Sequence, residues 1–221
     1  MAKNTSSASY GVIGLGRFGT ALVQTLADAG KEVLAIDNNE SKVKEVRQYT
    51  EHAYVTDDLS RETLEAAGIQ NCDTVIVCIG EKLDSSILTT LNVVALGVPK
   101  VIAKAISRDH GAVLEKIGAE VVYPEHDMAM RLAKRLLSGS VLDYISLSGD
   151  IDISELRITE RFVGRSVRDA DLRKKHGLNI IAIEHHGESM TEITPEYRFE
   201  TGDIVVVVGC RENLERFETE L

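Results

Sequence analysis

The sequence predicts an α/β protein in which a doubly wound parallel sheet is followed by a linking helix and a small α+β domain. Apolar, strand-like runs alternate with helical patterns as far as residue 124. The first strand-to-helix turn of this alternation is rich in glycine. Beyond Ser138-Gly-Ser140 the pattern changes to short strands that are separated by glycine turns.

Residues 9–124 form the first predicted domain. Its strands are expected at Tyr10–Ile13, Glu32–Asp37, His52–Val55, Thr74–Cys78, Lys100–Ala103 and Glu120–Tyr123. The helices between them are expected at Thr20–Ala29, Lys42–Tyr49, Ser60–Ala67, Lys82–Leu96 and Arg108–Ile117. A glycine follows most of these helical patterns, at the place where a helix commonly ends. Strands that alternate with helices in this way indicate one complete Rossmann unit.

Residues 125–140 are assigned to a helix with its linker, and residues 141–221 to the second domain. The helix opens at Pro124 and continues to Leu137 with two apolar stripes. Two stripes suit a helix that crosses to another subunit or one packed between two domains of the same chain, and the residues alone favour neither. In the second domain, strands are expected at Val141–Leu147, Ile151–Arg157, Asn179–His185, Ser189–Thr194 and Asp203–Gly209, and helices at Val167–Lys174 and Arg211–Leu221.

The composition is that of an ordinary globular protein of the cytosol. The chain has 221 residues, of which 43% are hydrophobic, and no apolar run approaches the length of a membrane span. Residues 1–8 lack the apolar centre of a secretion signal and are expected to be disordered. A net charge of −10 opposes nonspecific binding to nucleic acid. We therefore expect a cytoplasmic protein without a nucleic-acid partner.

The cysteines give no sign of a metal or redox site. Cys72, Cys78 and Cys210 form no CxxC pair, and no histidine lies at zinc-ligand spacing from them. Two of them fall in apolar, strand-like runs. We expect all three to be buried, reduced packing residues.

The sequence Gly-Leu-Gly-Arg-Phe-Gly at residues 14–19 predicts a nucleotide site. Gly14 permits a tight turn, Gly16 lets the backbone approach a pyrophosphate, and Gly19 lets the helix lie close to the sheet. The phosphates would then lie at the helix N-terminus, where free amide hydrogens and the positive end of the helix dipole attract anions.

Asp37 supplies the second half of this fingerprint. It ends the second predicted strand, 18 residues after Gly19, close to the roughly 20 residues expected for a ribose-binding carboxylate. A carboxylate there would bind both hydroxyls of an unmodified ribose and repel a 2′-phosphate, so NADP is disfavoured. The alternative role is a helix N-cap, for which Asn38, Asn39 and Ser41 are rival residues.

Charged residues near this turn favour a nucleotide with terminal phosphates, ATP or ADP. Arg17 lies inside the glycine turn, although a solvated surface arginine is the alternative. Lys104 and Arg108 follow the fifth strand and are expected at the same carboxyl edge of the sheet. Glu125 and Asp127 offer oxygen ligands for a magnesium ion, although acids in a first helical turn are also favoured by the helix dipole.

No catalytic constellation is evident. No tyrosine is followed by a lysine four residues later, and no Gly-x-Ser-x-Gly is present. His185-His186-Gly187 falls where a hairpin turn is expected, which we favour over a metal or catalytic site. We expect no enzyme, although an NAD-dependent oxidoreductase and an NAD(H)-responsive redox sensor are the competing interpretations.

These residues resemble a known family, the cytosolic potassium-transport regulators of the Ktr and Trk type, which are built on the RCK (regulator of potassium conductance) domain. The resemblance covers nearly the whole chain. It rests on the sequences of residues 10–19, 33–37, 105–119 and 124–128. Ala129 stands where glycine is common in the family.

The resemblance implies a regulator without enzymatic activity. Homodimers would assemble into a homo-octameric ring beneath a membrane potassium channel subunit of the KtrB, KtrD or TrkH kind, at the inner face of the cell membrane. ATP and ADP would favour different dimer shapes. Arg17 would contact the terminal phosphates, Asp57 the adenine, and Glu125 a cation at the γ-phosphate. The full set expected around the nucleotide is Gly14, Gly16, Arg17, Phe18, Gly19, Asp37, Asn38, Asp57, Asp58, Gly80, Lys104 and Glu125.

The second domain resembles the part of this family that binds cyclic di-AMP between two subunits. By this resemblance Arg173 would face a phosphate, and Ile180 and Ile181 would sandwich an adenine. Asn179 and Pro195 complete the set expected around this second ligand. A packed hairpin beside a solvated basic helix is an equally good interpretation of the same residues.

Overall fold

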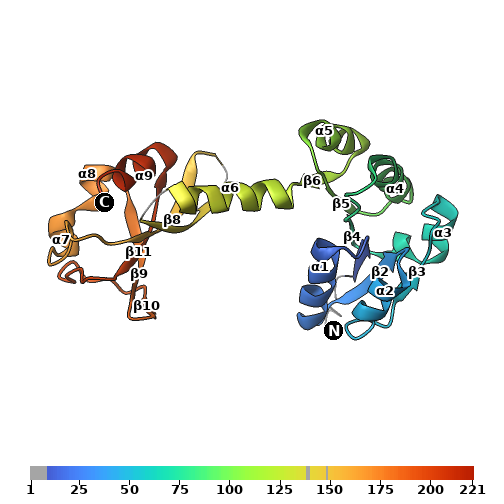
Figure 1. Cartoon of the computed structure of the whole chain (residues 1–221), viewed down its shortest axis with the longest axis horizontal. Helices are drawn as coiled ribbons and strands as arrows, with labels where there is room; N and C mark the ends of the chain where they lie inside the picture. Colours follow the sequence, from blue (N-terminus) through green and yellow to red (C-terminus); the bar gives the residue numbers. More distant parts are fainter. Residues whose placement is uncertain (1–8, 138–139, 148) are drawn as a thin grey trace, which may run out of the picture. The chain divides into compact units, whose positions relative to one another are not determined.

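The computed structural model describes residues 9–137, 140–147 and 149–221 of the chain (Figure 1). It divides into two compact units, Met1–His126 and Asp127–Leu221, which we call the N-lobe and the C-lobe. In the part of the chain that is described, no helix is both long and apolar enough to cross a membrane.

The N-lobe is built on a six-stranded parallel sheet in the order β3-β2-β1-β4-β5-β6. The strands are β1 (Ser9–Ile13), β2 (Glu32–Asp37), β3 (Ala53–Val55), β4 (Thr74–Val77), β5 (Lys100–Lys104) and β6 (Glu120–Val122). This order confirms the predicted doubly wound sheet. The strand order reverses between β1 and β4, and a crevice for ligands forms at the carboxyl ends of strands at such a point.

Helices cover both faces of this sheet. They are α1 (Arg17–Asp28), α2 (Glu40–Val46), α3 (Arg61–Ala66), the 3₁₀-helix η1 (Ile69–Asn71), α4 (Leu83–Ala95) and α5 (Arg108–Ile117). α1 begins at Arg17, three residues before the predicted start at Thr20, because Gly16 already serves as its N-cap. α2 begins at Glu40 because the side chain of Asn39 accepts hydrogen bonds from the amides of Ser41 and Lys42.

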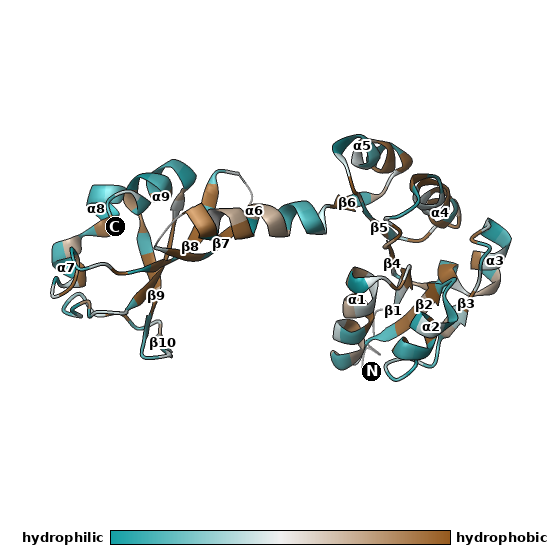
Figure 2. Ribbon diagram, in the orientation of Figure 1, coloured by the Kyte–Doolittle hydropathy of each residue, from teal (hydrophilic) through white to brown (hydrophobic). Residues whose placement is uncertain are grey.

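The N-lobe core follows from the alternation of side chains along the strands. Val12 packs in one apolar cluster with residues of α1 and α2, whereas Ile13 packs in another with residues of α3, η1, α4 and α5. Both side chains are at most 1% exposed, and burying a side chain of this size contributes about 1.5–3 kcal/mol. Figure 2 shows the central strands in the colour of hydrophobic residues. Because both faces of the sheet are apolar, helices must cover both.

α6 (Pro124–Leu137) runs from the end of the N-lobe into the C-lobe. The C-lobe holds a five-stranded antiparallel sheet in the order β10-β9-β11-β8-β7. Its strands are β7 (Val141–Ser146), β8 (Ile151–Arg157), β9 (Asn179–His185), β10 (Glu188–Met190) and β11 (Ile204–Cys210), and its helices are α7 (Val167–Ala170), α8 (Leu172–His176) and α9 (Arg211–Glu218). The predicted α+β class of this lobe is confirmed.

Two predicted elements of the C-lobe were wrong in detail. The single helix expected at Val167–Lys174 is split into α7 and α8, because Asp171 between them adopts the left-handed backbone conformation with φ of 47°. The strand expected at Ser189–Thr194 is the short edge strand β10, which ends at Met190.

The prediction of three buried cysteines holds for two of them. Cys72 and Cys78 are buried, and burial raises the pKa of both thiols, that of Cys78 to about 12. Cys210 is exposed, so the prediction was wrong there. It ends β11 and is the N-cap of α9, and the chain leaves the sheet at this residue.

Candidate nucleotide site

The glycine turn joins β1 to α1 in a conformation that two of its glycines make possible. Gly14 has a φ of 98°, and a Cβ there would lie 3.1 Å from the backbone carbon of Cys78. A Cβ on Gly19 would lie only 2.0 Å from the carbonyl oxygen of Gly14. Any side chain at residue 19 would therefore push α1 off the turn, as the sequence predicts.

Gly16 differs from these two glycines because the space beside it is open. A Cβ built there would meet none of the described residues within 4 Å, and the φ of −72° at Gly16 suits any residue. Gly16 is the N-cap of α1 but gives no side-chain hydrogen bond to the first amides of the helix. The amides at the start of α1 are thus available to an anion that occupies the open space.

A cavity of about 660 Å³ opens beside this turn at the carboxyl edge of the sheet. Ten of the twelve residues predicted around a nucleotide line it, namely Gly14, Gly16, Arg17, Phe18, Asp37, Asn38, Asp57, Gly80, Lys104 and Glu125. A cavity of this volume lies in the range that is typical of sites for small molecules and cofactors.

Gly19 and Asp58, the other two predicted residues, do not line the cavity. Gly19 acts through the packing of α1, whereas the role of Asp58 at the nucleotide stays a prediction. The Asp58 carboxylate accepts hydrogen bonds from the amide and the hydroxyl of Ser60 and from the hydroxyl of Thr63, which lowers its pKa. Asp58 therefore stabilises the start of α3. Arg108, expected at the same edge, is also not among the lining residues.

Sequence reasoning missed several residues of the cavity wall. Among them are two lysines, Lys42 in α2 and Lys82 before α4. Both follow the carboxyl end of a strand, β2 or β4, so the rule that placed Lys104 at this edge also applied to them. The remaining unpredicted lining residues are Ile13, Ile36, Thr56, Leu59, Cys78, Ile79, Glu81, Ser85, Ala105, Ile106, Tyr123 and His126.

Asp37 lies at the floor of this cavity with 8% of its surface exposed. Its Oδ2 accepts a hydrogen bond from the amide of Leu15 at 2.5 Å, and its Oδ1 accepts one from the amide of Asn39 at 2.8 Å. Asn39, and not Asp37, caps α2. A carboxylate has about four lone-pair positions, so Asp37 can still accept hydrogen bonds from ribose hydroxyls.

Residues of both charges also line this cavity. Arg17 is exposed at the first position of α1, whereas the side chain of Lys104 is only 13% exposed. Lys104 Nζ pairs with Glu125 Oε1 and lies 6.0 Å from the centre of the Phe18 ring. The hydrogen bond from Lys104 is the main reason that the pKa of Glu125 lies below its usual range, and the charge of Arg17 lowers it further. Cations at this place suit a ligand with phosphates.

A divalent cation would find only a partial site here. Among the described residues, no group of three or more His, Cys, Asp or Glu side chains is placed to hold a metal ion. Glu125 by itself would give one carboxylate oxygen, and it is paired with Lys104. Mg²⁺ commonly binds through one or two carboxylates together with substrate phosphates, so Glu125 fits a cation that arrives with a nucleotide.

In the C-lobe, the residues predicted around a second ligand lie on β9, α8 and the segment after β10. Ile181 is 41% exposed at a bulge of β9, where the register with β11 shifts, whereas Ile180 packs against the C-lobe core. Asn179, Arg173 and Pro195 are exposed. The exposed members are therefore accessible to a ligand or a partner, and the role assigned to the set stays a prediction.

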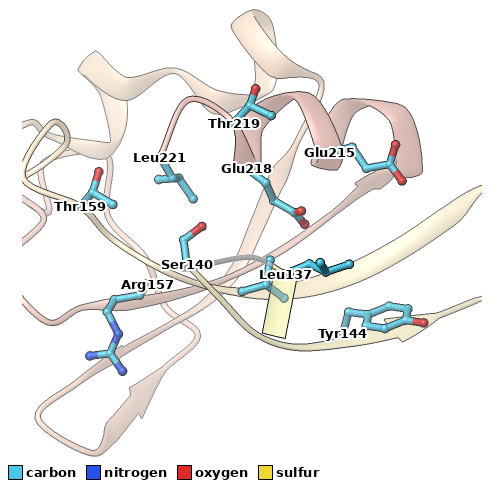
Figure 3. A pocket seen from close by; sticks show the side chains of 10 residues that line it. Leu137, Ser140, Tyr144, Arg157, Thr159, Glu215, Glu218, Thr219 and Leu221 are labelled. Carbon is cyan, nitrogen blue, oxygen red and sulfur yellow. The ribbon is translucent and has the colours of Figure 1, made fainter. Parts of the chain in front are cut away.

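A second cavity, of about 730 Å³, lies within the C-lobe beside β7 and α9 (Figure 3). None of the residues predicted around the second ligand lines it. Its walls are formed by Leu137, Ser140, Val141, Tyr144, Arg157, Thr159, Glu215, Glu218, Thr219 and Leu221.

His185 and His186 lie at the hairpin turn that the sequence predicts. His186 and Gly187 join β9 to β10, and both have positive φ, 51° and 83°. A two-residue loop with two positive φ values matches the twist of a tight hairpin. His185 Nδ1 lies 2.7 Å from Oδ1 of the fully buried Asp203, whose Oδ2 accepts a hydrogen bond from Tyr197.

Comparison with known proteins identifies the family. Residues 10–124 match the TrkA-N domain and residues 153–221 the TrkA-C domain. The chain is 40% identical over 210 residues to the Ktr system potassium uptake protein C of Bacillus subtilis (strain 168), with 95% of each chain covered. The chain belongs to the Ktr family of potassium uptake proteins. Protein A of the Ktr system of Vibrio alginolyticus is 34% identical over 211 residues, which cover 95% of this chain and 96% of that relative.

Solved structures support the same fold for this Ktr family member. The RCK domain of GsuK aligns with a TM-score of 0.52 and 22% identity over 97% of this chain and 46% of that one. The GsuK channel bound to NAD aligns with a TM-score of 0.50 and 21% identity over 97% of this chain and 38% of that one. The resemblance to the potassium-transport regulators is thus confirmed for the family and the fold.

Proposed function

We propose that this chain is a nucleotide-sensing regulatory subunit that gates a membrane potassium channel or transporter, and that ATP and ADP set its two states. Its family membership supplies the link to potassium uptake. The observation that carries the nucleotide part is the cavity at the glycine turn, which is lined by the buried carboxylate of Asp37 and by the cations Arg17 and Lys104.

The cations favour ATP and ADP over NAD(H). Arg17 and Lys104 both line the cavity, and the side chain of Lys104 is sheltered from solvent. Terminal phosphates carry more charge than the bridging pyrophosphate of a dinucleotide, so they gain more from two nearby cations. Asp57 is the residue that we assign to the adenine.

Switching requires that ATP and ADP bind the two states with different relative affinities. The two ligands differ only at the third phosphate, so the residues that reach it must supply the difference. Arg17 is the best placed of these because it is exposed and begins α1 inside the glycine turn. A Mg²⁺ ion held by Glu125 and the phosphates would add to the preference for ATP.

The assembly follows the family. We infer homodimers that form a homo-octameric ring in the cytoplasm, held at the inner face of the membrane by a potassium channel or transporter subunit. From the same resemblance we infer that cyclic di-AMP binds the C-lobe near Arg173, Asn179, Ile180, Ile181 and Pro195. All of these except Ile180 are exposed and so accessible to a ligand. The protein would then respond to ATP or ADP in the N-lobe and to cyclic di-AMP in the C-lobe, and it would perform no chemistry on them.

The alternative is an NAD(H)-responsive redox sensor or an NAD-dependent oxidoreductase. The GsuK channel bound to NAD gives this alternative its support, together with the preference of Asp37 for an unmodified ribose. An oxidoreductase would also need a proton donor or acceptor beside the nicotinamide. The sequence offers no Tyr-x-x-x-Lys pair for that role.

Thermal unfolding with each ligand separates these functions. A ligand present at 100 times its Kd adds about 2.7 kcal/mol to the stability of the protein that binds it. We expect ATP and ADP to raise the Tm, and Arg17→Ala to reduce the effect of ATP. Arg61→Ala is the matched control, since Arg61 is exposed at the start of α3 and outside the cavity. A Tm raised by NAD or NADH but by neither ATP nor ADP would refute the proposal in favour of the alternative.

A further inference from the structure

Gly111 leaves a slot in α5, and the tip of the Tyr123 side chain fills it. Gly111 is buried in helical backbone, where alanine is the better helix former. A Cβ at residue 111 would lie 1.8 Å from the hydroxyl oxygen of Tyr123, 2.7 Å from its Cζ and 3.2 Å from its Cε1. The slot, which is the space that a side chain of residue 111 would take, therefore holds the end of the tyrosine ring.

Tyr123 also lines the candidate nucleotide cavity. It directly follows β6 at the carboxyl edge of the sheet, and it is half-buried against the apolar cluster that contains Leu114 of α5. In the part of the chain that is described, the Tyr123 hydroxyl makes no hydrogen bond. The fit of the ring in the slot, and not a bond at its tip, therefore keeps the side chain in place.

The start of α5 is fastened to the same cavity wall. The hydroxyl of Ser107, the N-cap of α5, accepts a hydrogen bond of 3.2 Å from the amide of His110. Nδ1 of His110 accepts one of 3.4 Å from the amide of Ile106, which lines the cavity. Burial lowers the pKa of His110, which keeps its ring neutral and able to accept this bond. The slot is thus held at a defined place relative to the cavity.

We propose that Gly111 is a positioning residue for Tyr123: the ring lies along the cavity wall while the slot is open and turns into the cavity when the slot is filled. The inference rests on the proposed nucleotide site. A ring displaced from the slot has a cavity of about 660 Å³ beside it, whereas the apolar core on its other side is closely packed. The cavity is therefore where the displaced ring finds room.

This arrangement makes the ligand and α5 depend on each other. A nucleotide in the cavity holds the Tyr123 ring in the slot, and a shift of α5 that narrows the slot pushes the ring against the nucleotide. By linkage, the free energy with which α5 alters nucleotide binding equals that with which the nucleotide alters the position of α5. Gly111 and Tyr123 thus give the proposed site a mechanical connection to a helix outside it.

Gly111→Ala fills the slot with one methyl group and tests this connection. We expect the Kd for ATP and for ADP to rise about 5- to 100-fold, the loss that overpacking by so small a group commonly causes. A leucine at residue 123 is too short to reach the slot. In the Tyr123→Leu background, Gly111→Ala should therefore change either Kd by less than about 2-fold. Calorimetric titration of the wild type, both single variants and the double variant measures these effects.

Fluorine NMR follows the Tyr123 ring without any nucleotide. The protein is labelled with 3-fluorotyrosine, and the Tyr123 resonance is the one that is absent from Tyr123→Phe. We expect Gly111→Ala to shift this resonance and to increase its relaxation by a soluble gadolinium chelate, because the ring enters the open cavity. Glu115→Ala is the matched control, since Glu115 is exposed on α5 and outside the cavity. It should leave the resonance and both affinities unchanged.

The inference is overturned if Gly111→Ala leaves the Tyr123 resonance or the affinity for a nucleotide that binds the wild type unchanged. It is also overturned if Gly111→Ala weakens binding as strongly in the Tyr123→Leu background as in the wild type, since α5 would then act without the ring. If neither ATP nor ADP binds the wild type, the nucleotide proposal fails, and the resonance still decides where the ring lies. Should Gly111→Ala not fold, Gly111→Ala/Tyr123→Phe with a 3-fluorophenylalanine label replaces it, because the closest contact of the Cβ is then Cζ at 2.7 Å.

Discussion

The carboxylate of Asp37 accepts a hydrogen bond of 2.5 Å from the backbone amide of Leu15, across 22 residues of sequence. The bond ties the end of β2 to the glycine turn that begins after β1. Asp37 also accepts a hydrogen bond from the amide of Asn39. One buried side chain is therefore bonded both to the glycine turn and to the segment that leads into α2. The residue expected to bind the ribose therefore also shapes the site.

Asp37→Ala should accordingly lower both stability and nucleotide affinity. It leaves the buried amide of Leu15 without its acceptor, which costs about 1–3 kcal/mol. The amide of Asn39 also loses its acceptor but is only partly buried, so that loss costs less. ATP and ADP should weaken equally, because both carry the same ribose. Urea unfolding and calorimetric titration measure the two effects. Unchanged stability together with lost binding would show that the carboxylate contacts only ligand.

Gly16→Ala and Gly19→Ala should separate binding from folding. A Cβ at residue 16 has no neighbour within 4 Å in the part of the chain that is described, so we expect a Tm close to that of the wild type and weaker binding of ATP and ADP. A Cβ at residue 19 would lie 2.0 Å from a backbone oxygen, so α1 must shift and the Tm should fall by several degrees. Normal nucleotide binding by Gly16→Ala would mean that phosphates do not approach this turn.

Arg17→Ala should weaken ATP more than ADP. A hydrogen bond to a charged group contributes about 1.5–3 kcal/mol, which corresponds to a loss of ATP affinity of roughly 10- to 100-fold. Arg17 is exposed, so its removal should leave the Tm of the ligand-free protein nearly unchanged. Calorimetric titration of both nucleotides, with Arg61→Ala beside it, measures the difference. An equal loss of affinity for ATP and ADP would show that Arg17 does not contact the third phosphate.

We expect the C-lobe to lose stability as the pH rises above neutrality, because His185 then loses its proton. The hydrogen bond to buried Asp203 raises the pKa of His185 above its usual value, and the acids Glu200 and Glu188 add to this. A group whose pKa is raised by folding stabilises the folded state, and its full contribution is present at pH values below its pKa in the unfolded chain, about 6.5 for histidine. This contribution is lost as the pH rises through the pKa of the folded state. Tyr197 shares Asp203, and its pKa is raised to about 12, so it stays protonated throughout.

Thermal unfolding between about pH 5.5 and 8.5 tests this, since the window spans the usual pKa of histidine. His185→Gln should flatten the decline in Tm that the wild type shows above pH 6.5 or so. His52→Gln is the control, because His52 is exposed in the N-lobe and outside this network. An identical decline in the wild type and in His185→Gln would contradict the assignment.

The fold of the N-lobe could be predicted well because the sequence patterns that determine it involve residues close together in the chain. The alternation of apolar runs places every strand of the sheet, and the glycines mark a turn whose geometry permits no other residue at 19. Asp171 illustrates the opposite case, since its φ of 47° splits one predicted helix in two and an aspartate gives no certain sign of that conformation.

The candidate site was predicted less completely, because the partners of its side chains depend on contacts that form only in the folded chain. Asp58 stands one residue after Asp57, yet its carboxylate turns to Ser60 and Thr63 and away from the cavity. Lys104 and Glu125, 21 residues apart, were both expected around the nucleotide, but only the structure shows that they pair with each other. Cys210 was assigned to the core from its apolar neighbours, although the sheet ends at this residue.

Potassium flux is the most direct test of the central claim, that a nucleotide bound to this chain gates a membrane partner. The purified protein is added to vesicles that contain the membrane subunit of a Ktr system, and potassium uptake is measured with ATP, with ADP and without nucleotide. We predict that uptake differs between ATP and ADP and that Arg17→Ala abolishes this difference. Uptake that is the same under all three conditions would contradict the account.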